Sequence, residues 1–208
     1  MLLRKPSCDW LIVGLGNPGP SAPTAQQLAK QHSQVARRRT RRQPKRASLR
    51  LAERLGTRLD RAKFRGLYGQ ALWQGQKLIL LKPQTFMNAS GLSVMDAARF
   101  YKLPPEKCLI CVDDISLPVG TIRIRRKGSD AGQRGMRSII TLSGSDQFPR
   151  IKIGVGKKPH PDYDLAAWVL GHFSEEDQKA LVPVLDHSYE AVQQMIAGKI
   201  DRAMNLFN

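Results

Sequence analysis

The chain has 208 residues, a length that suits one well-buried domain and is short for two. Hydrophobic residues make up 41% and charged residues 25% of it, and no apolar run approaches the roughly 20 residues that would span a bilayer. The formal net charge of +17, from 34 basic and 17 acidic residues, indicates a polyanionic partner, of which nucleic acid is the first candidate, and says nothing about the fold.

The start of the chain lacks the layout of a signal peptide. The apolar run 11–15 is too short for a signal-peptide core, and Pro6 and Asp9 interrupt the residues before it. We therefore expect a cytoplasmic protein.

Three cysteines include Cys108 and Cys111, in a Cys-x-x-Cys spacing that can bind a metal. The run 108–112 is apolar and strand-like, with no second pair of ligands. Because successive strand residues point to opposite faces, the two thiols should diverge and serve as small core residues. We predict neither a metal nor a cofactor.

The first predicted strand spans 10–15 and runs into a turn at 16–20 that is dense in glycine and proline. The composition of 21–50 then changes abruptly to Gln, Ala, Ser, Pro and Arg, and no acid occurs between Asp9 and Glu53. Such a segment buries too little apolar surface to offset the entropy of ordering. We predict that it is disordered or a frayed helix.

Strands and helices alternate in the rest of the chain. The expected elements are a helix end at 51–56, a hairpin at 67–81, a helix at about 90–102, strands at 108–112, 121–126 and 150–155, a short helix at 136–142, and a long amphipathic helix capped by Ser174. The strands at 121–126 and 150–155 alternate apolar and basic residues, which is typical of half-exposed strands. This order predicts a single three-layer α/β domain with a mixed, largely parallel central sheet.

Four turns beside predicted strands carry polar residues suited to chemistry: 14–19, 82–88, 113–118 and 127–135. Gly14, Gly16 and Gly19 have the spacing of a dinucleotide fingerprint. Asn17-Pro18 and Pro20 fill that turn, however, and no helix with an apolar face follows directly. A nucleotide-dependent enzyme is therefore the weaker alternative.

Three of these segments match one family. Gly-Leu-Gly-Asn-Pro-Gly at 14–19, Lys-Pro-x-Thr-Phe-Met-Asn-x-Ser-Gly at 82–91 and Asp-Asp-x-x-Leu-Pro-x-Gly at 113–120 have the order and spacing seen in bacterial-type peptidyl-tRNA hydrolases. The segments 168–173 and 203–208 are similar too. The resemblance implies a peptidyl-tRNA hydrolase-like fold, hydrolysis of the ester between peptide and tRNA, tRNA and peptidyl-tRNA as partners, and a monomer.

The resemblance also implies roles for single residues. Asn17 resembles the asparagine that contacts the peptide portion, and Asp113 the carboxylate that orients the catalytic histidine. Phe86 and Asn88 resemble the pair that meets the tRNA 3′ end and the scissile ester. Without the other motifs, Asn17 would be better interpreted as a turn asparagine before proline, and Phe86 could be a core residue. Asp114 is better interpreted as a loop or surface acid.

The sequence departs from the family where the catalytic histidine should stand. The family continues through a tyrosine to Thr-Arg-His-Asn, but Ala22 and Gln27 occupy the tyrosine and histidine positions here. His32 is the nearest histidine and lacks the expected neighbours. For 21–50 we weigh a basic RNA-binding arm, a solvated linker, and an out-of-frame translation of the coding DNA, and we favour the last.

The glycine-rich loop departs as well, because Gln133 and Arg134 stand where the family has His-Asn. Gln133 keeps a hydrogen-bonding group, and Arg134 adds to a cationic face formed by 123–127, so we predict that both bind tRNA. The alternative to a hydrolase is a catalytically impaired RNA-binding homologue on the same scaffold, like relatives that act in organelle intron splicing.

Overall fold

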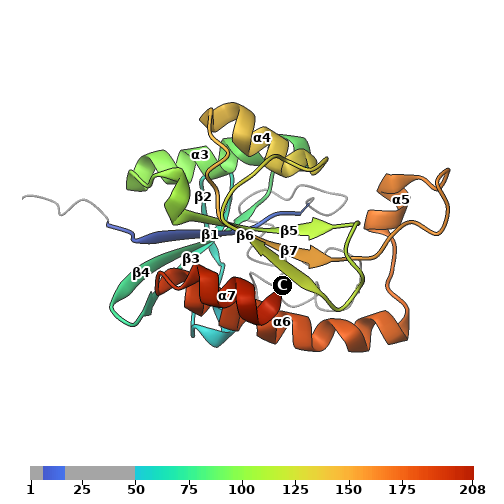
Figure 1. Ribbon diagram of the computed structural model, residues 1–208. Helices are drawn as coiled ribbons and strands as arrows, with labels where there is room; N and C mark the ends of the chain where they lie inside the picture. Colours follow the sequence, from blue (N-terminus) through green and yellow to red (C-terminus); the bar gives the residue numbers. More distant parts are fainter. Residues whose placement is uncertain (1–6, 17–49) are drawn as a thin grey trace, which may run out of the picture.

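The computed structural model describes residues 7–16 and 50–208 (Figure 1). The described residues form one α/β domain with a seven-stranded sheet in the order β2-β3-β4-β1-β5-β7-β6. The strands are β1 Trp10–Gly14, β2 Arg61–Lys63, β3 Gly66–Trp73, β4 Gln76–Pro83, β5 Cys108–Asp114, β6 Ile122–Arg125 and β7 Arg150–Gly154. The helices are η3 Met87–Ala89, α3 Ser90–Tyr101, η4 Pro105–Lys107, α4 Arg134–Ser143, α5 Leu165–Leu170, α6 Glu175–Ile196 and α7 Ile200–Phe207.

The sheet is mixed, as predicted. Its centre is parallel, because β1 pairs in parallel with β4 and β5, and β5 pairs in parallel with β7. The pairs β2–β3, β3–β4 and β6–β7 are antiparallel and lie toward the two edges. The hairpin between β3 and β4 turns at Gln74 and Gly75, whose φ angles of +46° and +80° suit the twist of a two-residue hairpin.

Helices cover both faces of the sheet and complete three layers (Figure 1). α3 and α4 lie on one face with a core that includes Val94 and Ile139, and α6 and α7 lie on the other with Val192 and Ala203. α6 begins at a capping box made by Ser174 and Asp177, as the sequence indicated. Within the described residues, no helix is long and apolar enough to cross a membrane.

Cys108 and Cys111 belong to the cores on opposite faces of the sheet, and both are free and buried. This confirms the prediction that the two side chains diverge. Burial raises the pKa of each thiol to about 12, so both are protonated at neutral pH.

The prediction of a half-exposed strand at 150–155 is wrong for β7. This strand lies between β5 and β6, and Arg150 is only 2% exposed. Its guanidinium donates hydrogen bonds to the carbonyl oxygens of Phe148 (3.1 Å), Ser129 (2.8 Å) and Asp146 (3.0 Å). A buried cation thus ties the loop before α4 to the segment between α4 and β7, whereas β6 does carry Arg123 outward as predicted.

The prediction for 21–50 falls almost entirely outside the described residues. Position 50 begins a helical turn that ends at Gly56, whose φ of +64° fits a glycine that terminates a helix. The helix end predicted at 51–56 is therefore confirmed.

Candidate active site

The carboxyl ends of β4, β1 and β5 lie side by side, because these strands are parallel neighbours. The chain leaves β1 through Leu15 and leaves β4 into the segment that holds Phe86 and Asn88, while β5 ends just beyond Asp113. Gln133, the N-cap of α4, reaches the same edge through its hydrogen bond to Asp113. Segments of all four predicted turns therefore meet at this edge of the sheet.

Gly135 permits this convergence. A Cβ atom at this position would lie 2.7 Å from Met87 Sδ, 2.9 Å from Leu15 Cδ1 and 3.0 Å from Gln133 Oε1. Only a residue without a side chain lets the first turn of α4 approach both β1 and η3 this closely. The glycine of the 127–135 loop is thus a packing requirement of the site.

Asp113 is the central acid of this edge. Gln133 Nε2 donates a hydrogen bond to Asp113 Oδ1 at 3.1 Å. Burial raises the pKa of Asp113 above its ordinary value, the neighbouring Asp114 adds to this rise, and the hydrogen bond from Gln133 opposes it. A carboxylate with a raised pKa that also accepts a hydrogen bond from a neighbouring side chain is typical of functional sites.

Asp114 is the last residue of β5, so the interpretation of this residue as a loop or surface acid is wrong. Its side chain is 11% exposed and pairs with Lys152 of β7 at 2.8 Å, and it also accepts hydrogen bonds from the Ser116 amide (2.8 Å) and hydroxyl (2.6 Å). Burial alone would raise the pKa of Asp114, but these hydrogen bonds outweigh it and lower the pKa. Asp114 is therefore paired with a cation, whereas the hydrogen-bond partner of Asp113 is the uncharged amide of Gln133.

Phe86 is 69% exposed, so the alternative of a core phenylalanine is wrong. It immediately precedes η3, and Asn88 lies exposed within that single turn. An exposed aromatic ring and an amide beside a buried acid can offer a stacking surface and a hydrogen-bond donor to one ligand.

The basic residues of β6, of the loop that follows it and of α4 are not all available to a ligand. Arg126 forms an ion pair with Asp201, and Arg137 pairs with Asp130 at 3.3 Å, so part of their charge is offset. Arg123 and Arg134 are exposed, and Arg134 is the first residue of α4, directly after Gln133. The cationic face predicted at 123–127 therefore offers fewer unpaired charges to a ligand than the sequence indicates.

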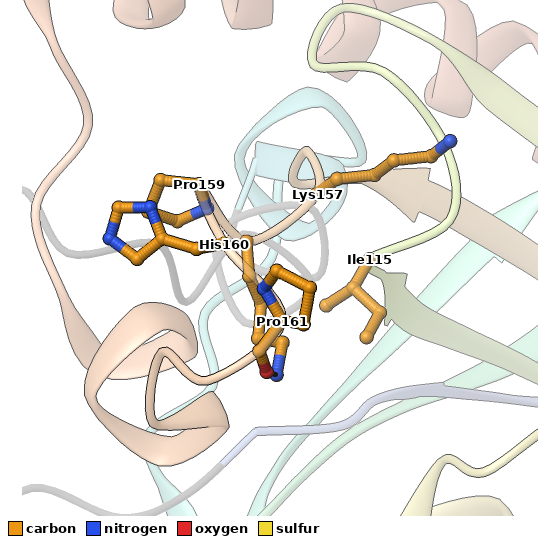
Figure 2. A pocket seen from close by; sticks show the side chains of 6 residues that line it. Ile115, Lys157, Pro159, His160 and Pro161 are labelled. Carbon is orange, nitrogen blue, oxygen red and sulfur yellow. Dashed lines mark hydrogen bonds between the residues drawn. The ribbon is translucent and has the colours of Figure 1, made fainter.

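A pocket of about 290 Å³ lies beside the loop that follows β5. Ile115 and Pro161 are among the residues that line it, and Figure 2 shows the side chains of Lys157 and His160 extending in different directions. The ammonium of Lys158 donates to the carbonyl of Pro161 and fixes the loop. This pocket was not predicted, although the run Lys-Lys-Pro-His-Pro after a strand is a recognisable loop signal.

Two predicted site residues, Asn17 and His32, lie outside the described residues, as do Ala22 and Gln27. Of the other candidates, the structure brings Asp113 and Gln133 into direct contact and places Asn88 and Phe86 on the segment after β4. Arg134 shares the N-terminus of α4 with Gln133.

The fold and this edge define a class: a three-layer α/β protein with a partly buried acid that accepts a hydrogen bond from an amide at the carboxyl ends of its parallel strands. The family model described as peptidyl-tRNA hydrolase matches residues 11–208. The chain therefore belongs to the peptidyl-tRNA hydrolase family.

Relatives and solved structures agree. A peptidyl-tRNA hydrolase of Caldanaerobacter subterraneus is 48% identical over 158 residues, covering 76% of this chain and 84% of that protein. One of Clostridium acetobutylicum is 41% identical over 199 residues, covering 96% and 97%. The crystal structure of peptidyl-tRNA hydrolase from Acinetobacter baumannii matches with a TM-score of 0.80 and 31% identity, covering 94% of this chain and 92% of that one.

Proposed function

We propose that this chain hydrolyses the ester bond between peptide and tRNA in peptidyl-tRNA and so releases tRNA for reuse. The observation that carries the proposal is the carboxylate of Asp113, which Gln133 holds at the sheet edge to which the Phe86–Asn88 segment also leads. Family membership over residues 11–208 supports the same reaction.

In this mechanism a water molecule attacks the ester carbonyl while a general base accepts its proton. Asp113 accepts a hydrogen bond from the base, which fixes the ring orientation and favours the protonated ring as it forms. The Asn88 amide donates to the oxyanion of the tetrahedral intermediate. When the intermediate collapses, the bond to the ribose oxygen breaks, and the protonated base returns its proton to that oxygen of the leaving tRNA. We assign the base to no described residue, and His32 is the candidate that the sequence offers.

The remaining assignments concern substrate binding. The exposed ring of Phe86 stacks on the terminal base of tRNA, and Asn17 contacts the peptide. Arg134 supplies charge to the phosphate backbone, together with exposed cations of β6 such as Arg123. The reaction consumes only water, and we infer a cytoplasmic monomer that acts without a metal or cofactor.

The test is the release of N-acetylated amino acid from N-acetyl-aminoacyl-tRNA. Turnover above the spontaneous rate is expected, and Asn88→Ala should lower it by about 10²-fold to 10³-fold, as for loss of an oxyanion donor. Asn205→Ala is the matched control, because this amide is exposed on α7, on the opposite face from α3 and α4. Binding of tRNA without any turnover would instead favour the RNA-binding homologue.

A further inference from the structure

The side-chain amide of Gln133 is engaged at both ends. Its Oε1 accepts a hydrogen bond from the backbone N–H of Met136 at 2.8 Å, and its Nε2 donates to Asp113 Oδ1 at 3.1 Å. Nε2 also lies 3.4 Å from Met87 Sδ. Both ends of the amide are therefore used by the protein, which argues against a direct contact between Gln133 and RNA.

Chemistry fixes the direction of this amide. Turning it over would place Oε1 against the carboxylate of Asp113, and the NH₂ group against the N–H of Met136. Both new contacts would be repulsive. Because the carbonyl end caps α4, the NH₂ end must face Asp113.

We propose that Gln133 is a positioning residue that selects which oxygen of Asp113 serves the general base. Gln133 occupies Oδ1 and leaves Oδ2 to accept from the base. The part played by the general base rests on the proposed hydrolase function, whereas the hydrogen bond between Gln133 and Asp113 does not depend on that function. An amide carries no charge at any ordinary pH, so the donor in the hydrogen bond to Asp113 is present across the whole pH range.

The charges around Asp113 show how much its ionised form depends on Gln133. Asp114 is the neighbouring acid, and its charge is offset by Lys152. The N-terminus of α4 adds a partial positive charge. Among the described residues, Gln133 is the side chain whose hydrogen bond opposes the effect of burial on Asp113.

The decisive variants separate capping from positioning. Gln133→Ser and Gln133→Asn keep a side chain that caps helices well, but both are too short to replace the contact with Asp113. α4 should stay folded, with a melting temperature unchanged in acid, where Asp113 is neutral, and the pKa of Asp113, followed by ¹³C NMR of its carboxyl carbon, should rise. An unchanged Asp113 pKa in both variants overturns the proposal.

Kinetics supply the second readout. With free imidazole supplied as the base, loss of the hydrogen bond should lower kcat by about 10-fold to 100-fold, the range for a bond to a charged group, and leave KM unchanged. A raised KM with unchanged kcat would show that Gln133 binds tRNA instead. A wild-type chain without turnover would refute the hydrolase function, and the NMR titration would still decide the role of Gln133.

Discussion

Asp113 and Asp114 are consecutive residues of β5 whose pKa values shift in opposite directions. Successive residues of a strand face opposite sides of the sheet, so the two carboxylates meet different neighbours. Asp114 meets Lys152 and Ser116, whereas Asp113 is buried against an uncharged amide. Ionised Asp114 therefore stabilises the fold, whereas ionisation of Asp113 at the site lowers the stability of the folded protein.

The first prediction follows from these signs. The folded-state pKa of Asp114 is lowered, so its contribution to stability is present above about pH 3.8 and is lost as pH falls through the folded pKa. The folded-state pKa of Asp113 is raised, so ionisation of this group costs stability as pH rises through that value. Asp114→Asn should therefore destabilise the protein at neutral pH, by about 1–3 kcal/mol, and Asp113→Asn should stabilise it.

Urea unfolding of both variants across the acid and neutral range checks this. Both differences from wild type should shrink in acid, where the carboxyl groups become neutral in folded and unfolded chains. The same sign for the two variants at neutral pH would contradict the assignment.

The second prediction concerns Phe86. Phe86→Ala should weaken tRNA binding by about 1–3 kcal/mol, the usual loss for one stacked base, with no change in melting temperature because the ring is 69% exposed. Leu72→Ala is the control, since Leu72 is 68% exposed and pairs with Lys77 near the start of β4, away from the site. Equal effects of the two substitutions on binding would argue against stacking.

The sequence predicted most of the fold because its strongest signals are local. The apolar runs in β1, β4 and β5 and the cap at Ser174 each lie within a few residues, and the structure confirms them. α7 was missed although Ile200, Ala203 and Phe207 have helical spacing. β2 gave no signal, because its three residues are exposed and form a strand only by pairing with β3.

The site was predicted in its parts but not in its contacts. The motif positions of Asp113 and Asn88 follow from the resemblance, yet the partners of Asp113 and Asp114 are 20 and 38 residues away in the chain. Burial of Arg150 likewise depends on β6 closing over β7. Alternation of apolar and basic residues cannot distinguish such an interior strand from an edge strand.

The third prediction separates packing at the site from packing elsewhere. Gly135→Ala should cost about 1–3 kcal/mol, because Met87 and Leu15 can move the ends of their side chains. Gly91→Ala should cost more, since its Cβ would lie 2.4 Å from the backbone oxygen of Ser138, which cannot move alone. Turnover per folded molecule should fall further in Gly135→Ala than in Gly91→Ala. The reverse order in unfolding free energy would contradict this packing.

The fourth prediction concerns the buried guanidinium of Arg150. Arg150→Met keeps the bulk of the side chain but leaves three carbonyl oxygens without their donors, at about 1–3 kcal/mol for each that stays buried. Arg123→Met, on the exposed face of β6, should change stability by no more than about 0.5 kcal/mol. Thermal unfolding of the two variants gives the comparison. Equal stability would mean that the carbonyls find other partners.

The last prediction is that the chain with this sequence is a poor hydrolase. Asp113 and Asn88 are present, but Gln27 stands where the resemblance places the catalytic histidine. A positioned general base is worth about 10²-fold to 10⁴-fold in rate, or about 3–5.5 kcal/mol of barrier. Gln133 holds the carboxylate of Asp113, which can accept a hydrogen bond from a histidine ring. The carboxylate aids catalysis only when such a ring lies within hydrogen-bond reach.

Cleavage of peptidyl-tRNA by the chain and by its His32→Ala variant decides the matter. Weak turnover that the substitution leaves unchanged is expected, because His32 lacks the arginine and asparagine that flank the family histidine. Free imidazole should then raise the rate, since it can supply the missing base beside Asp113. Turnover at the level of the relatives that disappears in His32→Ala would instead make His32 the base. It would also show that residues 21–50 are a working part of the enzyme and not an out-of-frame translation.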